Sequence, residues 1–364
     1  MFENYRVFET EFAGRKISFE TGKMCALANA SILVRYGDTA VLCNVTASKT
    51  PREGIDYFPL SVDFDEKLYS VGKIPGSFPR REGRPTDRAI LDSRVVDRPM
   101  RPLFPKDMRN DCSVVMSALS VDPDYPYVIC GMLGASMATA ISDIPWNGPI
   151  AGCQVALVDG EIVLNPTAEQ EAKSDLHLIV SSTDKKVVMI EAGANEVNNE
   201  TMLKAIMTAH EENVKMVNFI NSVVAEIGKP KFEYQKIEVP QELFDAIKDF
   251  AIEDVKKALD TDDKNVRDAA LQPIIAAIHE KFDEIYPDDI IKIDEAIYKL
   301  QKYVVRRWLI DEGKRVDGRG LNEIRPLAAE VGLLPRVHGS GMFTRGQTQV
   351  LSICTLNTLS AAQK

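Results

Sequence analysis

Short apolar runs rich in β-branched residues, separated by polar turns, predict strands over most of the first 224 residues. The strongest hairpin signal is Asp159-Gly160, a two-residue turn between the apolar segments 154–158 and 161–164. A further strand pair is predicted at 176–180 and 187–190, on either side of a polar connection. These pairs predict antiparallel sheet.

Five other segments follow a helical pattern. They are 131–140 and 199–227 among the strands, then 243–251, 263–284 and 293–304. Helices interspersed with hairpins predict an α+β domain in the first part of the chain. The later helices carry Asp, Glu and Lys on their outer faces, which fits a helical spacer, with a dedicated binding module as the alternative. Pro273 is expected to kink the middle helix or to mark a restart.

The same strand-turn-strand pattern occurs twice along the chain. Residues 31–42 and 340–351 share Ser, Gly, Thr, Val and Leu in register, and each contains a glycine turn followed by an apolar run. A repeat at this offset predicts a duplicated domain rather than a short-period solenoid. We expect one whole domain and the opening of a second.

Charge is distributed unevenly over the 364 residues, a length that predicts about two or three domains. The net charge is −10, which argues against nucleic-acid binding when taken alone. Residues 241–312 hold 18 acidic against 11 basic side chains, whereas residues 73–109 hold 10 basic against 5 acidic. The overall acidity therefore conceals a basic segment.

Residues 73–85 are punctuated by Gly and Pro and are predicted to form a loop. The candidate RNA-binding residues in it are Phe78, Arg80, Arg81 and Arg84. RNA channels combine cations that hold phosphates with flat faces on which bases stack, at roughly 1–3 kcal/mol per base. The alternative is an ordinary surface loop whose arginines pair with Glu82 and Asp87.

Further arginines follow this loop, interleaved with the carboxylates of Asp92 and Asp97. Arg98 and Arg101 are candidates for the same RNA channel. Ion pairs within the chain are the favoured alternative for these arginines.

Residues suited to metal binding or nucleophilic chemistry are sparse. Asp63 and Asp65 would project from one face of a strand, which can hold magnesium, but an ion-paired surface is the favoured interpretation. The six cysteines form no C-x-x-C pair and are expected to be buried free thiols, and the four histidines are far apart. We therefore assign no metal site.

Targeting signals are absent from the sequence pattern. No apolar run approaches the ~20 residues that span a bilayer, and the first residues lack the basic-then-apolar layout of a signal peptide. We expect a cytoplasmic protein without a membrane partner.

Seven stretches, in order along the chain, resemble one enzyme family. They are 73–85, 97–105, 147–150, 164–167, 315–319, 334–340 and 343–349. In combination they are similar to the N-terminal half of the bacterial polynucleotide phosphorylases, also called polyribonucleotide nucleotidyltransferases. The resemblance implies an α+β, ribonuclease PH-like (ribosomal protein S5 domain 2-like) core domain at 1–230, an all-α helical domain at 238–312, and a second ribonuclease PH-like domain that begins at 313 and is truncated at 364.

The family resemblance also implies an activity. These enzymes are phosphate-dependent 3′-to-5′ exoribonucleases that release nucleoside diphosphates in mRNA degradation, act as homotrimers on single-stranded RNA, and work with RNA-degradation machinery. Their Arg-rich loop grips RNA at the mouth of the ring, a role that falls here to Phe78, Arg80 and Arg81, while Arg345 is a further channel candidate. This chain has Pro79 where the family usually has a second aromatic residue.

The resemblance places the reaction centre outside this sequence. In the family, the phosphate-binding serines and the residues that act with Mg²⁺ lie well inside the second core domain, so we expect no catalytic residue before Lys364. Mg²⁺ and the co-substrate inorganic phosphate would serve the full-length protein, and none is expected to be held by this chain. The chain is expected to supply RNA binding and scaffold, and the alternative is a non-catalytic RNA-binding or assembly fragment.

Overall fold

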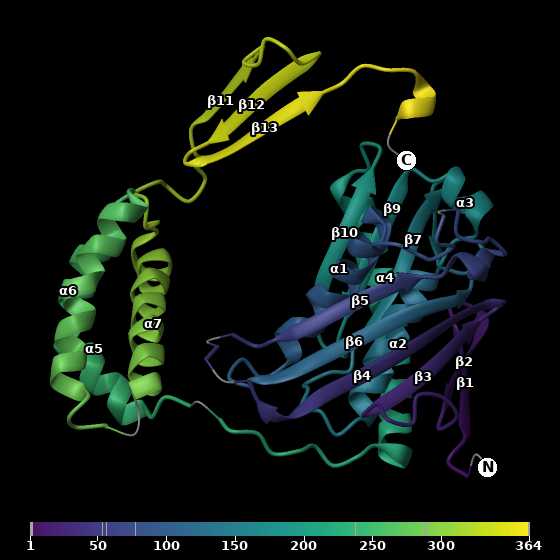
Figure 1. Ribbon diagram of the computed structural model, residues 1–364, viewed down its shortest axis with the longest axis horizontal. Coiled ribbons are helices and arrows are strands. Elements are labelled where there is room, and N and C mark those ends of the chain that lie inside the picture. The colour runs from purple at the N-terminus through teal and green to yellow at the C-terminus, as the bar shows by residue number, and fades with distance from the viewer. Residues whose placement is uncertain are drawn as a thin grey trace. The chain divides into compact units, whose positions relative to one another are not determined.

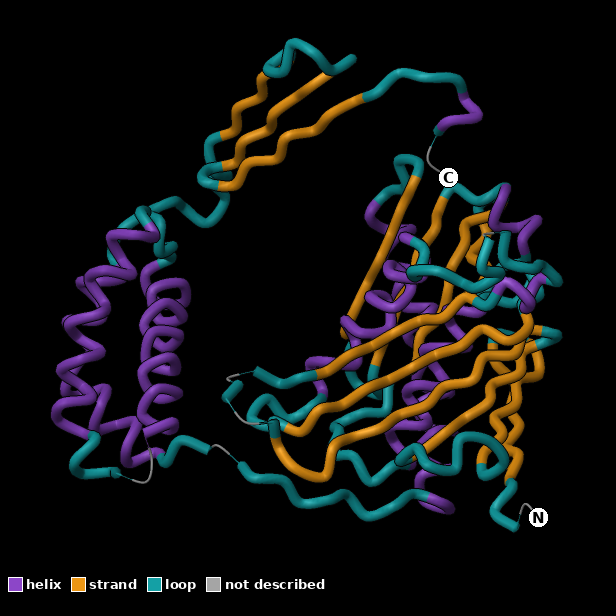
Figure 2. Tube along the Cα trace, viewed as in Figure 1, coloured by secondary structure: helices purple, strands orange, loops and turns teal. Residues whose placement is uncertain are grey.

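The computed structural model describes residues 3–52, 54–55, 57–76, 78–236, 238–287 and 290–362 (Figure 1). The chain divides into two compact units, residues 1–236 and 237–364. Figure 2 distinguishes their helices, strands and loops. Each unit is described by itself.

The first unit contains two β-sheets. The larger has the order β1-β2-β3-β4-β6-β5, in which only the β5–β6 pair is parallel, and the smaller has the antiparallel order β10-β9-β7-β8. The strands of the larger sheet are β1 (Arg6–Phe12), β2 (Arg15–Thr21), β3 (Ala30–Tyr36), β4 (Thr39–Pro51), β5 (Leu60–Glu66) and β6 (Asn110–Ser120). Those of the smaller are β7 (Ala151–Val158), β8 (Glu161–Leu164), β9 (Leu176–Ser182) and β10 (Val187–Ala194). Both hairpins predicted between residues 154 and 190 are confirmed.

Four helices accompany these sheets. They are α1 (Asp87–Met100), α2 (Tyr127–Ile141), α3 (Ala168–Ala172) and α4 (Asn199–Ile227). Helix α2 packs against β3, β4 and β6 of the larger sheet and against β7 of the smaller one, and thirteen of its fifteen residues are buried. A helix covered on all sides needs no polar face, which explains its uniformly small and apolar composition. The helices predicted at 131–140 and 199–227 and the α+β class are confirmed.

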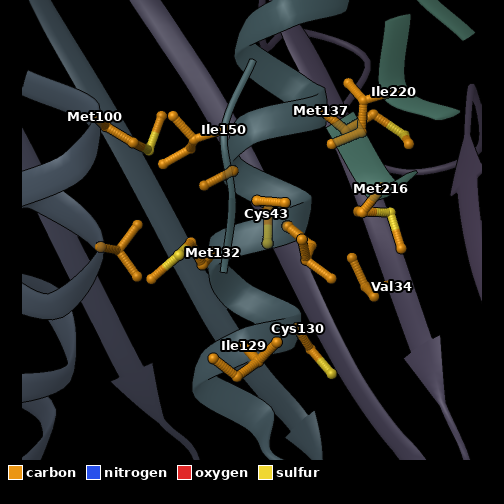
Figure 3. Packing of buried hydrophobic residues seen from close by; sticks show 14 of the residues in the cluster. Val34, Cys43, Met100, Ile129, Cys130, Met132, Met137, Ile150, Met216 and Ile220 are labelled. Atoms are coloured by element: carbon orange, nitrogen blue, oxygen red, sulfur yellow. The ribbon is translucent and has the colours of Figure 1, made fainter. Parts of the chain in front are cut away.

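Two glycines of α2 allow this close packing. A Cβ atom on Gly134 would lie 2.5 Å from Cys43 Sγ and 2.7 Å from Val34 Cγ2, and one on Gly131 would lie 2.5 Å from the Phe64 ring. Figure 3 shows Val34 and Cys43 beside this helix within the buried cluster. The packing of this core therefore depends on the absence of a side chain at Gly131 and Gly134 as much as on its large residues.

The cysteine prediction is only partly right. Cys43, Cys112, Cys130 and Cys153 are buried free thiols, and burial raises the pKa of the Cys130 thiol to about 12. Cys25 and Cys354 are exposed. Cys25 lies in a turn with a φ of 55°, and Cys354 ends a strand whose residues are all exposed, so neither belongs to the core.

The repeated pattern forms the same hairpin in both units. In the first, β3 and β4 close at the pair Tyr36–Thr39; in the second, β12 (Gly339–Arg345) and β13 (Thr348–Cys354) close at the pair Arg345–Thr348. Strand β11 (Leu327–Val331) pairs with β12 as β2 pairs with β3. The predicted repeat of the strand-turn-strand pattern is thus confirmed. The structure extends it by a third strand, because β11 corresponds to β2.

The second unit also contains three helices. They are α5 (Gln241–Leu259), α6 (Lys264–Phe282) and α7 (Ile290–Arg307), followed by a π-helical turn at Trp308–Glu312. Their apolar faces meet in one buried cluster that includes Ile247, Ile278 and Leu300. The predicted helices are confirmed, but the restart at Pro273 is wrong, because α6 runs through it. A proline removes one backbone hydrogen bond, which the packed helix tolerates.

Candidate RNA-binding loop

The Arg-rich loop is part of a crossover between two parallel strands. Because β5 and β6 run in the same direction, the chain must return along the sheet between them, and it does so through residues 67–86 and helix α1. The loop therefore emerges at the carboxyl end of β5. Its position is set by the sheet, although its own residues are not part of any strand.

The two ends of this loop are tied together. Thr86 donates a hydrogen bond from Oγ1 to Glu66 Oε2 at 2.7 Å, and the same oxygen accepts from the backbone N–H of Ala89 at 3.0 Å. Thr86 is thus the N-cap of α1 while it binds the last residue of β5. One side chain fixes both the start of the helix and the closure of the loop.

A second contact closes the loop nearer its tip. Glu82 accepts a hydrogen bond from the backbone N–H of Leu68 at 2.8 Å and lies 3.5 Å from Lys67 Nζ, which is also 3.1 Å from Asp65. Burial acts to lower the pKa of Lys67, but the two carboxylates outweigh it and raise that pKa. Glu82 is therefore engaged by the two residues that directly follow β5.

The candidate binding residues lie on the outer part of this closed loop. The side chain of Phe78 is fully exposed, at 100%. Arg80 and Arg84 are exposed, and Arg80, with a φ of 54°, donates to the backbone carbonyl of Pro75 at 3.4 Å. Arg81 is exposed as well. An exposed aromatic ring beside several guanidinium groups can stack a base and contact phosphates.

A half-buried polar cluster lies below the loop. The Tyr127 hydroxyl is 2.7 Å from Glu66 Oε1 and 2.8 Å from Asp92 Oδ2, and Arg88 Nε is 3.8 Å from Asp92. Burial is the main cause that raises the pKa of Asp92, and repulsion from Glu66 adds to it, against the opposing influence of Tyr127 and Arg88. Sequence spacing does not predict this cluster, because its residues come from three separate elements. They are Glu66 of β5, Arg88 and Asp92 of α1, and Tyr127 of α2. One signal in the sequence is that Tyr127 begins a helix of small and apolar residues, so its hydroxyl needs a polar partner elsewhere.

The other arginine candidates are placed differently. Arg98 pairs with Glu191 of β10, and Arg101 lies 2.8 Å from Asp97 and donates to the backbone carbonyl of Leu60 at 3.0 Å. These contacts match the ion-pair alternative. Arg345 is exposed in the second unit, at the turn of the β12–β13 hairpin.

The carboxylates considered for magnesium have partners of their own. Asp63 accepts a hydrogen bond from Ser61, and Asp65 pairs with Lys67. Among the residues that the structure describes, no group of three or more His, Cys, Asp or Glu is arranged to hold a metal ion. In the same residues, no helix is both long and apolar enough to cross a bilayer.

Comparison with known families agrees with this architecture. The model of domain 1 of the 3′ exoribonuclease family matches residues 13–145, and that of its domain 2 matches residues 148–212. A third model, described as the RNA binding domain of polyribonucleotide nucleotidyltransferase, matches residues 242–320. The fold is therefore of the ribonuclease PH type, which defines the class as 3′ exoribonuclease-like.

Individual relatives specify the family within this class. The chain is 51% identical over 359 residues to the polyribonucleotide nucleotidyltransferase of Ruminiclostridium cellulolyticum and 54% identical over 361 residues to that of Lachnoclostridium phytofermentans. The alignments cover 99% of this chain and 51% and 52% of those proteins. The chain belongs to the polyribonucleotide nucleotidyltransferase family and spans about half the length of the curated relatives it matches.

A solved structure of rice (Oryza sativa) Rrp46 is also similar. It has 14% sequence identity and a TM-score of 0.48, over 59% of this chain and 96% of the rice chain.

Proposed function

We propose that the protein to which this sequence belongs is a phosphate-dependent 3′-to-5′ exoribonuclease that releases nucleoside diphosphates in mRNA degradation. Family membership supports the activity. Within this chain, the observation that carries the proposal is the closed loop that presents Phe78, Arg80, Arg81 and Arg84 to solvent. Single-stranded RNA is the substrate that such a surface would hold.

The chemistry of phosphorolysis assigns separate roles to the loop and the reaction centre. Inorganic phosphate attacks the terminal phosphodiester, so the RNA must be held with its 3′ end in line with the attacking oxygen. Mg²⁺ would neutralise charge that develops on the transferred phosphoryl group in the full-length protein. The loop would contribute by holding the RNA strand, and we assign no described residue to the metal or to phosphate attack.

For this chain alone, the second candidate function is RNA binding without catalysis. It is favoured by the partners already engaged by Asp63 and Asp65 and by the exposed loop. We further infer a homotrimer in the full-length form, contact with RNA-degradation machinery and a cytoplasmic location, all from the family. The predicted domain limits at 1–230, 238–312 and 313–364 also remain proposals.

RNA binding by the loop can be tested with fluorescently labelled oligo(A) and the 364-residue chain. The variant Arg80→Ala with Arg81→Ala should bind about tenfold more weakly or worse at low salt, because phosphate contacts are lost. The matched control is Lys185→Ala with Lys186→Ala, which removes two exposed cations from the β9–β10 turn. Equal affinities for the two double variants would refute the role of the loop.

A further inference from the structure

A pocket of about 850 Å³ in the second unit has a lining rich in cations. It is formed by the first turn of α6, the end of α7, the segment after it, and the turn between β12 and β13. Its basic lining residues are Lys264, Arg267, Arg315, Arg319, Arg325 and Arg345. Three acidic residues, Asp262, Asp317 and Glu323, also line it. The pocket therefore has an excess of three positive charges, although residues 241–312 are acidic overall.

Two of the arginines form the rigid wall of this pocket. Arg315 donates to the backbone carbonyls of Leu321 and Glu323 at 2.8 and 3.1 Å, and Arg319 donates to that of Glu323 at 2.8 Å and to Asp317 at 2.9 Å. Burial acts to raise the pKa of Asp317, but Arg319 and Arg325 outweigh it and hold that pKa below its usual value. Asp317 thus stays ionised and fixes Arg319 in place.

Other cations of the pocket are open to a ligand. Within the part of the chain that the structure describes, no carboxylate pairs with Lys264 or Arg345. Arg267 makes one long ion pair, with Nε 3.9 Å from Asp268 Oδ1, and Asp268 does not line the pocket. Arg267 is half-buried, with 26% of its side chain exposed. Positive charge gathered without anionic partners costs electrostatic free energy, which a bound anion would relieve.

An apolar pocket of about 460 Å³ adjoins the cationic one. The two share Arg267, Val305, Leu309 and Val316, and Leu259 extends the apolar lining. Gln301, Lys302 and Arg306 complete the lining of the smaller pocket. Ligand sites in proteins are typically concavities of about 300–1,000 Å³ with apolar walls and a few polar groups that orient the ligand. A ligand that fits here needs an anionic end joined to a flat or apolar body.

We propose that the two pockets together bind a nucleoside diphosphate, with its phosphates between Lys264, Arg267 and Arg345. The base would lie against Val305, Leu309 and Val316. A nucleoside diphosphate carries about three negative charges near neutral pH. The larger pocket has an excess of three positive charges, and Lys302 and Arg306 of the adjoining pocket add two more, so the combined lining favours an anion of this kind. One guanidinium group can also donate two parallel hydrogen bonds to two oxygens of a phosphate group. The ligand is of the product class of the phosphorolysis proposed above, but its binding here does not require that activity.

The experiment is a calorimetric titration of the 364-residue chain with ADP. We expect saturable binding, adenosine weaker by about tenfold or more, and displacement of ADP by inorganic pyrophosphate. The variant Lys264→Gln with Arg345→Gln should weaken ADP binding by about tenfold or more. The control, Lys256→Gln with Lys257→Gln, removes two cations of α5 that do not line either pocket and should leave it within about twofold.

Several results would overturn the proposal. These are equal affinity for ADP and adenosine, failure of pyrophosphate to displace ADP from the unaltered chain, and ADP binding that survives in a folded Lys264→Gln, Arg345→Gln variant. If ADP does not bind but this variant loses affinity for oligo(A), the pocket is an RNA site and the proposal is wrong. ADP binding in a chain that does not bind oligo(A) would support this site and refute the proposed RNA-binding role instead.

Discussion

Gly37 and Gly346 occupy the same position in two copies of one hairpin, with φ angles of 57° and 58°. Each begins a two-residue turn, and this left-handed conformation is one that glycine adopts at little cost. In the first unit the turn also packs tightly, since a Cβ on Gly37 would lie 2.3 Å from the Tyr125 ring. That ring in turn contacts Tyr36, with centroids 4.9 Å apart.

Gly37→Ala should therefore destabilise the first unit by more than backbone strain alone. Strain at a positive φ costs roughly 1–2 kcal/mol, and displacement of the Tyr125 ring adds about 1–3 kcal/mol. The control is Gly160→Ala, which has a φ of 82° and no described atom within 4 Å of the added Cβ. Urea unfolding should show a clearly larger loss for Gly37→Ala, and equal losses would contradict the packing role of this turn.

Phe78→Ala should weaken binding of oligo(A), because an exposed ring on which a base stacks contributes roughly 1–3 kcal/mol. Phe78→Tyr keeps the aromatic face and should bind as the unaltered chain does. Fluorescence anisotropy with labelled oligo(A) measures both variants. If alanine is as good as tyrosine at this position, bases do not stack on residue 78.

Arg84→Ala should reduce the salt dependence of RNA binding. Each lost phosphate contact lowers the slope of log affinity against log salt by about one. Lys185→Ala, an exposed cation in the β9–β10 turn, should leave the slope unchanged. A slope that is the same for Arg84→Ala and the unaltered chain would mean that this arginine touches no phosphate.

Asp92→Asn should change how stability depends on pH. The folded-state pKa of Asp92 is raised, so the folded protein binds this proton more tightly than the unfolded chain does. Stability from this group is present below the ordinary aspartate pKa and falls as the pH rises from there through the raised value. An asparagine amide does not titrate in this range, so the variant should lack this decline.

Unfolding free energies measured across the acidic range would test this prediction. Asp184→Asn, which changes an exposed carboxylate in the β9–β10 turn, provides the control and should retain the decline. A decline of the same size in Asp92→Asn would show that another group causes it.

The sequence predicted local elements well, for identifiable reasons. The turn at Asp159-Gly160 depends on two residues that tolerate a positive φ, and both adopt one, at 52° and 82°. Helix α4 has the bounds that its helical pattern predicts, and in the structure Asn198 caps its start.

The contacts that close the loop were not predictable in the same way. The basic composition of residues 73–85 indicated a binding loop, but the engagement of Glu82 with Lys67 and Leu68 depends on how the chain turns back after β5. The Tyr127 cluster likewise brings Glu66 and Asp92 together across three elements. Contacts of this kind depend on which strands lie side by side in the sheet. Local sequence patterns do not specify that order.

The most direct test of the proposed role is a combined binding and phosphorolysis measurement. The 364-residue chain is incubated with oligo(A), inorganic phosphate and Mg²⁺, and bound RNA and released ADP are both quantified, with a full-length relative as the positive control. We predict RNA that is bound through the loop, with no ADP above the level seen without protein. ADP release at a rate like that of the full-length relative, or no RNA binding at all, would contradict the account.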